Sequence, residues 1–204
     1  MIYIINYGTG NIKSIERAIS LLGYEYKVVE DTKSINKATH LILPGVGSYK
    51  TAISYLKEKN LDQKIIEASN NNIGLIGICL GMQLLLDSSL EDGYSKGLSL
   101  IPGKVIGLKE LCDTEKVPHI GWNKIYFNDN KITQKTLENQ EFYFLHSFFC
   151  APENKENILT VTNFGEKRFC SSLHFKNIAG SQFHPEKSRS QGHLFIKYLL
   201  ELTR

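Results

Sequence analysis

Cys79 lies between two glycines in the stretch GICLGMQ (residues 77–83), directly after a continuous apolar run. The pattern Gly-x-Cys-x-Gly at the end of a buried strand is the cysteine form of a nucleophile elbow, a tight strand–turn–helix connection that exposes the reactive atom. A thiol at a helix N-terminus lies near positive dipole charge, which favours the thiolate. The N–H of Leu80 would then point to the place where an oxyanion forms. The alternative is a small buried core residue, as Cys150 and Cys170 are expected to be.

A histidine and a carboxylate follow one another closely in SQFHPEKS (residues 181–188). His184 and Glu186 stand two positions apart at the end of an expected strand, so their side chains lean to the same side. A base beside its own orienting carboxylate supplies the remaining part of a nucleophile–base–acid triad. Taken alone, His-Pro commonly just ends a strand. The other histidines are expected at a strand edge (His40), at the surface (His174 and His193) or without a carboxylate at this spacing (His119 and His146).

The stretch LPGVGSY (residues 43–49) follows an expected strand. Gly45 and Gly47 suit a loop whose backbone N–H groups face a ligand, which would provide the second half of an oxyanion hole. The alternative is an ordinary strand-to-helix loop.

The elements that must position these residues alternate between strand and helix in the first half of the chain. MIYIIN, YEYKVV, HLILPG and IGLIGI are expected strands, and the last is apolar throughout, as in a strand buried on both faces of a parallel sheet. Helices are expected after Asn11, ending at Gly23, after Ser48, and over residues 80–88. This alternation predicts an open parallel sheet with helices on both faces.

The second half consists mainly of strand-like segments separated by turns. KVIGL, WNKIYF, FYFLHSFF, ILTVTNF, RFCSSLHF and IAGSQF are expected strands, and helices are expected only at residues 133–139 and 192–202. With no linker, repeat or low-complexity tract, residues 1–204 are expected to form one α/β domain. Its sheet is open, mixed and mainly parallel, flanked by helices, with an antiparallel extension.

Composition narrows the class of protein. Apolar residues make up 42% and charged residues 22% of the chain, and the net charge of +3 is too small to argue for nucleic acid or a membrane surface. No signal peptide or membrane-spanning run is recognised, so a cytoplasmic location with reduced thiols is expected. Cysteine and histidine spacings do not match a zinc site, so neither a metal nor another cofactor is expected.

Together these motifs resemble the class I (triad) glutamine amidotransferases, and within them the glutaminase subunits of imidazole glycerol phosphate synthases. GICLGMQ and FHPE mark the class, and YGTGN, PHIGWN and the Lys187-Ser188 ending narrow it to the subunit. The resemblance implies a flavodoxin-like architecture and hydrolysis of L-glutamine to glutamate and ammonia. It also implies a heterodimer in which a (βα)8 cyclase subunit receives the ammonia for histidine biosynthesis.

The resemblance also implies residue roles. The catalytic residues are Cys79, His184 and Glu186. The substrate and oxyanion residues are Val46, Gly47, Leu80, Gln83, Glu91, Ser147 and Phe148. The partner-interface residues are Asn11, Trp122 and Lys187. The alternatives are an exposed helix residue for Gln83, a solvated charge for Glu91 and Lys187, and a core residue for Trp122. Two departures from the family pattern touch no member of the triad: Asn6 replaces an aspartate, and Phe148 replaces a tyrosine.

Other functions fit less well. YGTGNIK with Glu30 imitates a dinucleotide fingerprint, but Lys13 stands where the third glycine belongs. An α/β-hydrolase shares the elbow but places its acid long before the histidine. A non-catalytic scaffold subunit, and a related glutaminase that feeds amidation of a surface sugar, remain open at this point.

Overall fold

The computed structural model describes residues 1–8, 10–33, 35–128 and 135–204, which contain a 12-stranded mixed sheet. Its strand order is β2-β1-β3-β4-β14-β13-β11-β7-β5-β6, with β12 beside β13 and β9 beside β12. The first five strands in this order run parallel: β2 (Tyr26–Val29), β1 (Ile2–Ile5), β3 (His40–Leu43), β4 (Gly74–Ile78) and β14 (Ile178–Ser181). The four parallel strands predicted in the first half of the chain are therefore confirmed, whereas β14 joins them from the second half, where only the antiparallel extension was expected.

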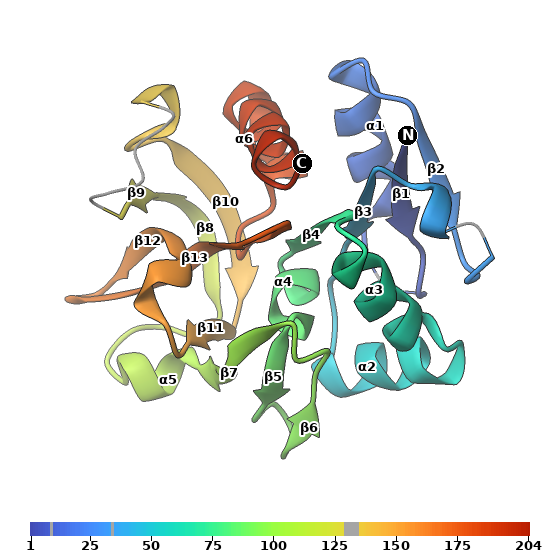
Figure 1. Ribbon diagram of the computed structural model, residues 1–204. Coiled ribbons are helices and arrows are strands. Elements are labelled where there is room, and N and C mark those ends of the chain that lie inside the picture. Colours follow the sequence, from blue (N-terminus) through green and yellow to red (C-terminus); the bar gives the residue numbers. More distant parts are fainter. Residues whose placement is uncertain (9, 34, 129–134) are drawn as a thin grey trace.

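Helices cover both faces of this block (Figure 1). On one face lie α1 (Ile12–Leu21) and α6 (Arg189–Leu202), and on the other α2 (Tyr49–Glu58) and α3 (Leu61–Asn70). Alternate side chains of β1 enter different cores: Ile2 and Ile4 pack with α1 and α6, while Tyr3 and Ile5 pack with α2 and α3. Burial on both faces explains why the parallel strands are apolar without alternation.

Beyond β14 the sheet continues mainly with antiparallel neighbours. These strands are β13 (Lys167–Phe175), β12 (Ile158–Phe164), β9 (Tyr126–Phe127), β11 (Phe148–Pro152) and β7 (Ile101–Gly107). At the far edge, β5 (Leu86–Ser89) runs parallel to β7 and pairs with the short β6 (Ser95–Lys96). This part of the sheet is the predicted antiparallel extension.

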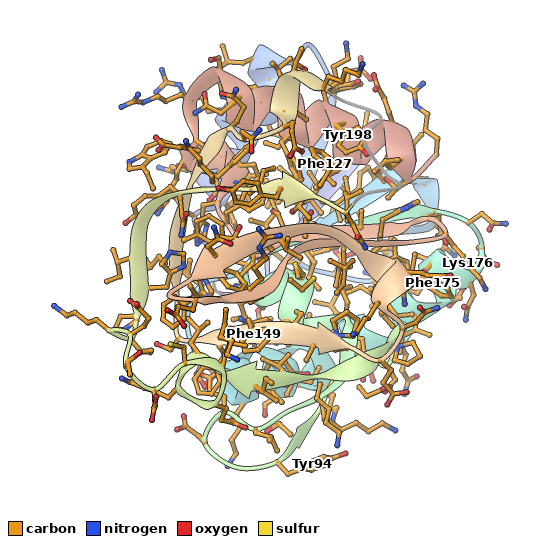
Figure 2. All side chains as sticks on the ribbon, turned by 90° about the vertical axis from the view of Figure 1, so that its left-hand side faces the viewer. Tyr94, Phe127, Phe149, Phe175, Lys176 and Tyr198 are labelled. Atoms are coloured by element: carbon orange, nitrogen blue, oxygen red, sulfur yellow. The ribbon has the colours of Figure 1, made fainter. Side chains whose placement is uncertain are left out.

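A separate antiparallel pair, β8 (His119–Lys124) and β10 (Glu141–His146), contacts β12 and the turn before α6, and in Figure 1 it lies between β12 and α6. The extension also meets the helical layer. In Figure 2, Phe127 of β9 lies beside Tyr198 of α6, and the two ring centroids are 6.0 Å apart. The short helix α5 (Leu108–Leu111) follows β7, and 3-10 turns occupy Ile35–Lys37, Lys135–Leu137, Lys155–Asn157 and Pro185–Lys187.

The expected helix over residues 80–88 is wrong in its second half. The helix α4 spans only Leu80–Leu84, and β5 begins at Leu86. The apolar residues Leu84, Leu85 and Leu86 suit a helix or a buried strand equally well. Pairing of β5 with β7, a contact distant along the chain, decides for the strand.

Other boundaries also differ from expectation. The helix α3 was not predicted, although Leu61, Ile65 and Ala68 lie on one buried face of it. The expected helix at 133–139 lies partly outside the described residues, and its described part is a 3-10 turn. The last helix begins at Arg189 rather than at residue 192. Among the described residues, no helix is long and apolar enough to cross a membrane.

Candidate active site

Cys79 occupies the sharp connection between β4 and α4. Its backbone angles, φ 53° and ψ −110°, lie in a region that residues with a side chain rarely adopt. The flanking glycines make room for this turn. A Cβ atom on Gly81 would lie 1.8 Å from the Leu43 carbonyl oxygen, and one on Gly77 would lie 2.6 Å from the carbonyl carbon of Gly81. The spacing Gly-x-Cys-x-Gly is therefore required by packing at a strained elbow.

His184 and Glu186 come to this elbow from the neighbouring strand. Strand β14 pairs with β4, and the Cys79 N–H donates to the Ser181 carbonyl at 2.7 Å. The carboxyl ends of both strands thus bring Cys79 and His184 to the same edge of the sheet. His184 Nδ1 lies 2.8 Å from Glu186 Oε1, and each of these two side chains is only 2% exposed. The predicted base and its orienting acid are adjacent and buried.

The electrostatic surroundings of His184 favour its charged form. Burial alone would lower its pKa, but the charge of the nearby Cys79 and the charge and hydrogen bond of Glu186 outweigh burial and raise the pKa to about 10. Nε2, the nitrogen turned away from Glu186, makes no hydrogen bond of normal geometry within the described part of the chain. Such a nitrogen is available to exchange a proton with the nucleophile or a leaving group.

A cavity of about 210 Å³ opens beside Cys79. It is smaller than the pockets of about 300–1,000 Å³ that hold drug-sized ligands, which suits a small polar molecule. Its lining contains Cys79 and all of the predicted substrate and oxyanion residues, together with two residues that were not predicted. The lining residues are Val46, Gly47, Cys79, Leu80, Gln83, Glu91, Leu145, His146, Ser147 and Phe148.

The loop after β3 packs directly on the helix that follows Cys79. A Cβ atom on Gly45 would lie 2.6 Å from Leu80 Cβ, so the loop requires glycine there. Gly47 adopts φ +105°, a conformation that favours glycine. The Tyr7 hydroxyl donates to the Pro44 carbonyl and fixes the start of the loop. Val46 and Gly47 of this loop and Leu80 of α4 thus line the same cavity.

Gln83 is not the exposed helix residue of the alternative interpretation, since it is only 5% exposed. Its Nε2 donates to the Phe148 carbonyl at 2.9 Å and to Gln182 Oε1 at 3.2 Å. Because both hydrogens of Nε2 are used, Oε1 is the atom left for a ligand in the cavity. The contact also shows that the Phe148 carbonyl, and not a side-chain hydroxyl, is used here, so the tyrosine-to-phenylalanine departure does not affect it.

Sequence reasoning missed Gln182. This residue is completely buried, and its Nε2 lies 3.7 Å from Cys79 Sγ. Gln83 fixes the orientation of this side chain, because a donor to Oε1 leaves the NH2 group facing the sulfur. The sequence signal available was a long polar side chain, Gln182, among the small and apolar residues of the strand IAGSQF before His184.

Glu91 has a structural partner as well as a place in the cavity. Its Oε2 accepts from the backbone N–H of Tyr49 at 3.1 Å, so this carboxylate, and not the Ser48 side chain, caps α2. Burial raises the pKa of Glu91, although the hydrogen bond from Tyr49 acts in the opposite direction. The alternative of a solvated loop charge is therefore not supported.

The expected interface residues are exposed, and two of them share a surface. Trp122 is 42% exposed, which contradicts a core position, and its ring centroid lies 6.0 Å from that of Tyr143. Lys187 Nζ lies 5.9 Å from the Tyr143 centroid, and the Arg189 guanidinium lies 4.9 Å from the Trp122 centroid. Asn11 is exposed immediately before α1, which contacts the 3-10 turn that contains Lys187.

Some expectations for other polar residues need correction. His40 is not at a strand edge: it lies in the interior strand β3, is 8% exposed, and its Nε2 is 3.0 Å from the Leu200 carbonyl. Asn11 precedes α1 as expected, but its side chain makes no capping hydrogen bond to the described residues. Asn6 donates to Glu30 Oε1 at 2.6 Å, which accounts for Glu30 without a nucleotide. In the described residues, histidine, cysteine and carboxylate side chains form no cluster suited to a metal ion.

Comparisons with known proteins identify the family to which the chain is similar. The family model described as "Glutamine amidotransferase class-I" matches residues 3–200. The protein named "Imidazole glycerol phosphate synthase subunit HisH" from Chlorobaculum tepidum is 38% identical over 202 residues, which cover 98% of this chain and 100% of that protein. "Imidazole glycerol phosphate synthase subunit HisH 2" from Methanococcus maripaludis is 44% identical over 197 residues, 94% of this chain and 95% of that protein.

Solved structures share the fold at low sequence identity. "Crystal structure of glutamine amidotransferase" superimposes with a TM-score of 0.76 at 16% identity and covers 100% of this chain and 99% of that one. "Structure of PurLQS from Thermotoga maritima" gives a TM-score of 0.75 at 16% identity, covering 100% of this chain and 98% of that one.

Proposed function

Because this chain belongs to the class-I glutamine amidotransferase family, we propose that it is the glutaminase subunit of an imidazole glycerol phosphate synthase in histidine biosynthesis. It hydrolyses L-glutamine through Cys79, His184 and Glu186 and passes the ammonia to a (βα)8 cyclase subunit. The observation that carries the proposal is the strained cysteine elbow, which lies beside a buried His–Glu pair and opens into a small cavity lined by the predicted substrate residues.

The first half-reaction forms a thioester. The Cys79 thiolate attacks the carboxamide carbon of glutamine, and the carbonyl oxygen becomes an oxyanion that accepts from backbone N–H groups of Leu80 and the Val46–Gly47 region. His184, charged in its surroundings, gives its proton to the departing nitrogen as the C–N bond breaks. Ammonia and a thioester on Cys79 result.

The second half-reaction restores the enzyme. Neutral His184 takes a proton from water, whose oxygen attacks the thioester carbon, and the C–S bond breaks to release glutamate and the thiolate. Glu186 stabilises the imidazolium that forms again and holds the ring with Nδ1 facing the carboxylate. No metal or cofactor takes part in this sequence.

The cavity supplies contacts for the rest of the substrate. Gln83 Oε1 can accept from the substrate's ammonium group, and the Glu91 carboxylate adds negative charge to the lining of the same cavity. Ser147 and Phe148 also line the cavity, and the Phe148 carbonyl lies directly against Gln83 Nε2. These residues recognise the ends of glutamine that do not react.

The partner surface consists of Trp122, Tyr143, Lys187 and Arg189, with Asn11 nearby. An aromatic and basic cluster of this kind is typical of the energetically important part of an interface. Since Lys187 directly follows Glu186, a cyclase subunit that docks on this surface contacts the residue next to the catalytic carboxylate. We expect the chain alone to hydrolyse glutamine slowly and the docked cyclase to activate it.

The test is glutamate release from L-glutamine, measured with this chain alone and with the synthase subunit and its acceptor substrate. Cys79→Ala should abolish release while partner binding persists, and Cys112→Ala is the matched control, because Cys112 is a partly buried cysteine outside the cavity. The glutamine analogue diazo-oxo-norleucine should label Cys79. Label on Cys112, Cys150 or Cys170 would contradict the assignment of the nucleophile.

The partner part of the proposal has its own test. Trp122→Ala and Lys187→Ala should weaken binding of the cyclase subunit and its activation of glutamine hydrolysis. Full activity of the isolated chain, or unchanged binding and activation in both variants, would contradict the proposed interface. Activation by a synthase that amidates a surface sugar, but not by the cyclase, would assign the chain to that other pathway.

A further inference from the structure

Two histidines that the reaction does not use lie side by side at the wall of the cavity, one lining it and the other packed behind. His119 on β8 and His146 on β10 are directly opposite in the strand register, and His119 Nδ1 lies 3.1 Å from His146 Nε2. His146 is only 7% exposed and lines the cavity. The His119 ring packs among the rings of Phe144, Phe164 and Phe169, with centroids 4.9 to 5.8 Å away.

Hydrogen-bond partners fix the proton on each ring. His146 Nδ1 lies 2.9 Å from the Phe148 carbonyl oxygen, which can only accept, so Nδ1 carries a hydrogen. In a neutral ring Nε2 is then bare and accepts from His119 Nδ1–H. His119 Nε2 is bare in turn and accepts from Asn123 Nδ2 at 3.2 Å, and that amide also donates to the Asn163 carbonyl at 3.0 Å.

This arrangement requires both rings to be neutral, since a charged imidazole has no acceptor nitrogen. Burial lowers the pKa of both histidines, and that of His146 falls to about 3. The hydrogen bond to the Phe148 carbonyl acts in the opposite direction but is outweighed by burial. The pair therefore stays neutral at physiological pH.

The series of hydrogen bonds from Asn123 through His119 and His146 ends at the Phe148 carbonyl oxygen, which also holds Gln83 in the wall of the cavity. The Phe148 carbonyl accepts from His146 on one side and from Gln83 Nε2 on the other. Gln83 in turn contacts Gln182, which donates toward Cys79 Sγ. Displacing this carbonyl would release Gln83 and change the wall of the cavity.

We infer that His119 and His146 are positioning residues for glutamine hydrolysis, which as a hydrogen-bonded pair hold the Phe148 carbonyl and, through it, Gln83 in place. This inference rests on the proposed function and names residues that act at the same site. At its other end this series of hydrogen bonds begins at Asn123, next to Trp122 of the partner surface, so the wall of the cavity is tied to the strand that carries that surface.

Two variants at His119 separate hydrogen bonding from packing. His119→Phe keeps an aromatic ring among its neighbours but has no donor for His146. His119→Asn keeps an N–H close to the position of Nδ1 but loses most of the ring. Loss of one buried hydrogen bond should raise KM for glutamine about tenfold in His119→Phe with a smaller effect on kcat, and His119→Asn should recover much of that loss.

The kinetic test uses the full chain with its synthase subunit and L-glutamine. A wild-type KM in His119→Phe, or equal impairment of the two variants, would overturn the inference, because packing alone would then explain the pair. If the wild-type chain itself releases no glutamate from glutamine, the proposed function fails, and that outcome is distinct from either of these.

A spectroscopic test on the wild type does not depend on how well the variants fold. Imidazole nitrogen chemical shifts should show both rings neutral, with hydrogen on Nδ1 and bare Nε2, from about pH 6 to about pH 9. A charged ring at His119 or His146, or hydrogen on Nε2 of either, would overturn the inference even if the wild type hydrolyses glutamine normally.

Discussion

The elbow at Cys79 holds its backbone at φ 53° and ψ −110°, a conformation that suits glycine and disfavours residues with a Cβ atom. Such a conformation costs on the order of 1–3 kcal/mol. We therefore compare the free energies of unfolding of the Gly and Ala variants at position 79 and at an unstrained buried position. We predict that replacing Ala by Gly costs less stability at position 79 than at the unstrained position. Both replacements remove the thiol, so their difference reports the backbone and the methyl group alone.

Cys150 is the matched control, because it lies in the middle of β11 and is completely buried. There, Ala-to-Gly costs about 0.5–1 kcal/mol through chain entropy and about 0.8 kcal/mol through the buried methyl group. The same two terms apply at Cys79 and cancel when the pairs are compared. What remains is the strain, so glycine should be favoured at Cys79 over Cys150 by about 1–3 kcal/mol.

Urea and thermal unfolding of the four variants measure this difference. For a chain of this length, 1 kcal/mol corresponds to about 2–4 °C in Tm, so the two Gly-minus-Ala shifts should differ by about 2–12 °C. If glycine costs as much stability at position 79 as at position 150, the elbow stores no strain. The account of the Gly-x-Cys-x-Gly spacing would then rest on the packing of Gly77 and Gly81 alone.

Three further predictions concern the chemistry of the site. His184→Ala should reduce glutamine hydrolysis by on the order of 10⁴ or more and Glu186→Gln by less, because the carboxylate orients a base that still carries the proton; unchanged steady-state activity in either variant would exclude the triad. Cys79→Ser should lower the pKa of His184, since the cysteine is the main cause that raises it, and an imidazole NMR titration with no downward shift would contradict this. In the wild type, the stability gained from charged His184 is complete below the unfolded pKa of about 6.5 and is lost as the pH rises toward the folded pKa of about 10. Because the folded pKa should be lower in Cys79→Ser, urea unfolding of that variant should show the loss of stability at a lower pH than in the wild type. Gln182→Leu removes the donor to Cys79 Sγ and should slow alkylation of Cys79 by diazo-oxo-norleucine about tenfold; an unchanged rate would remove Gln182 from the site.

The sequence by itself determined the features that depend on neighbours along the chain. The apolar strand before Cys79 and the two glycines around it predicted the elbow, because the turn is built from consecutive residues. The short spacing of His184 and Glu186 predicted an adjacent base and acid for the same reason. The alternation of strands and helices in the first half of the chain predicted β1, β2, β3 and β4 of the parallel block, since each of these strands is recognisable from its own composition, but it did not predict that β14 joins them.

Only the tertiary structure decided the contacts that depend on strand register and on distant segments. Residues 86–89 form a strand because β7 pairs with them, although their composition allows a helix. Glu91 caps a helix that begins 42 positions earlier in the chain. The His119–His146 pair exists because β8 and β10 align in one register, and a shift by one residue would turn these side chains to the opposite face. Hydrogen bonds between side chains of different strands have no signature in the local sequence, because the pairing of the strands determines which side chains come within hydrogen-bonding distance.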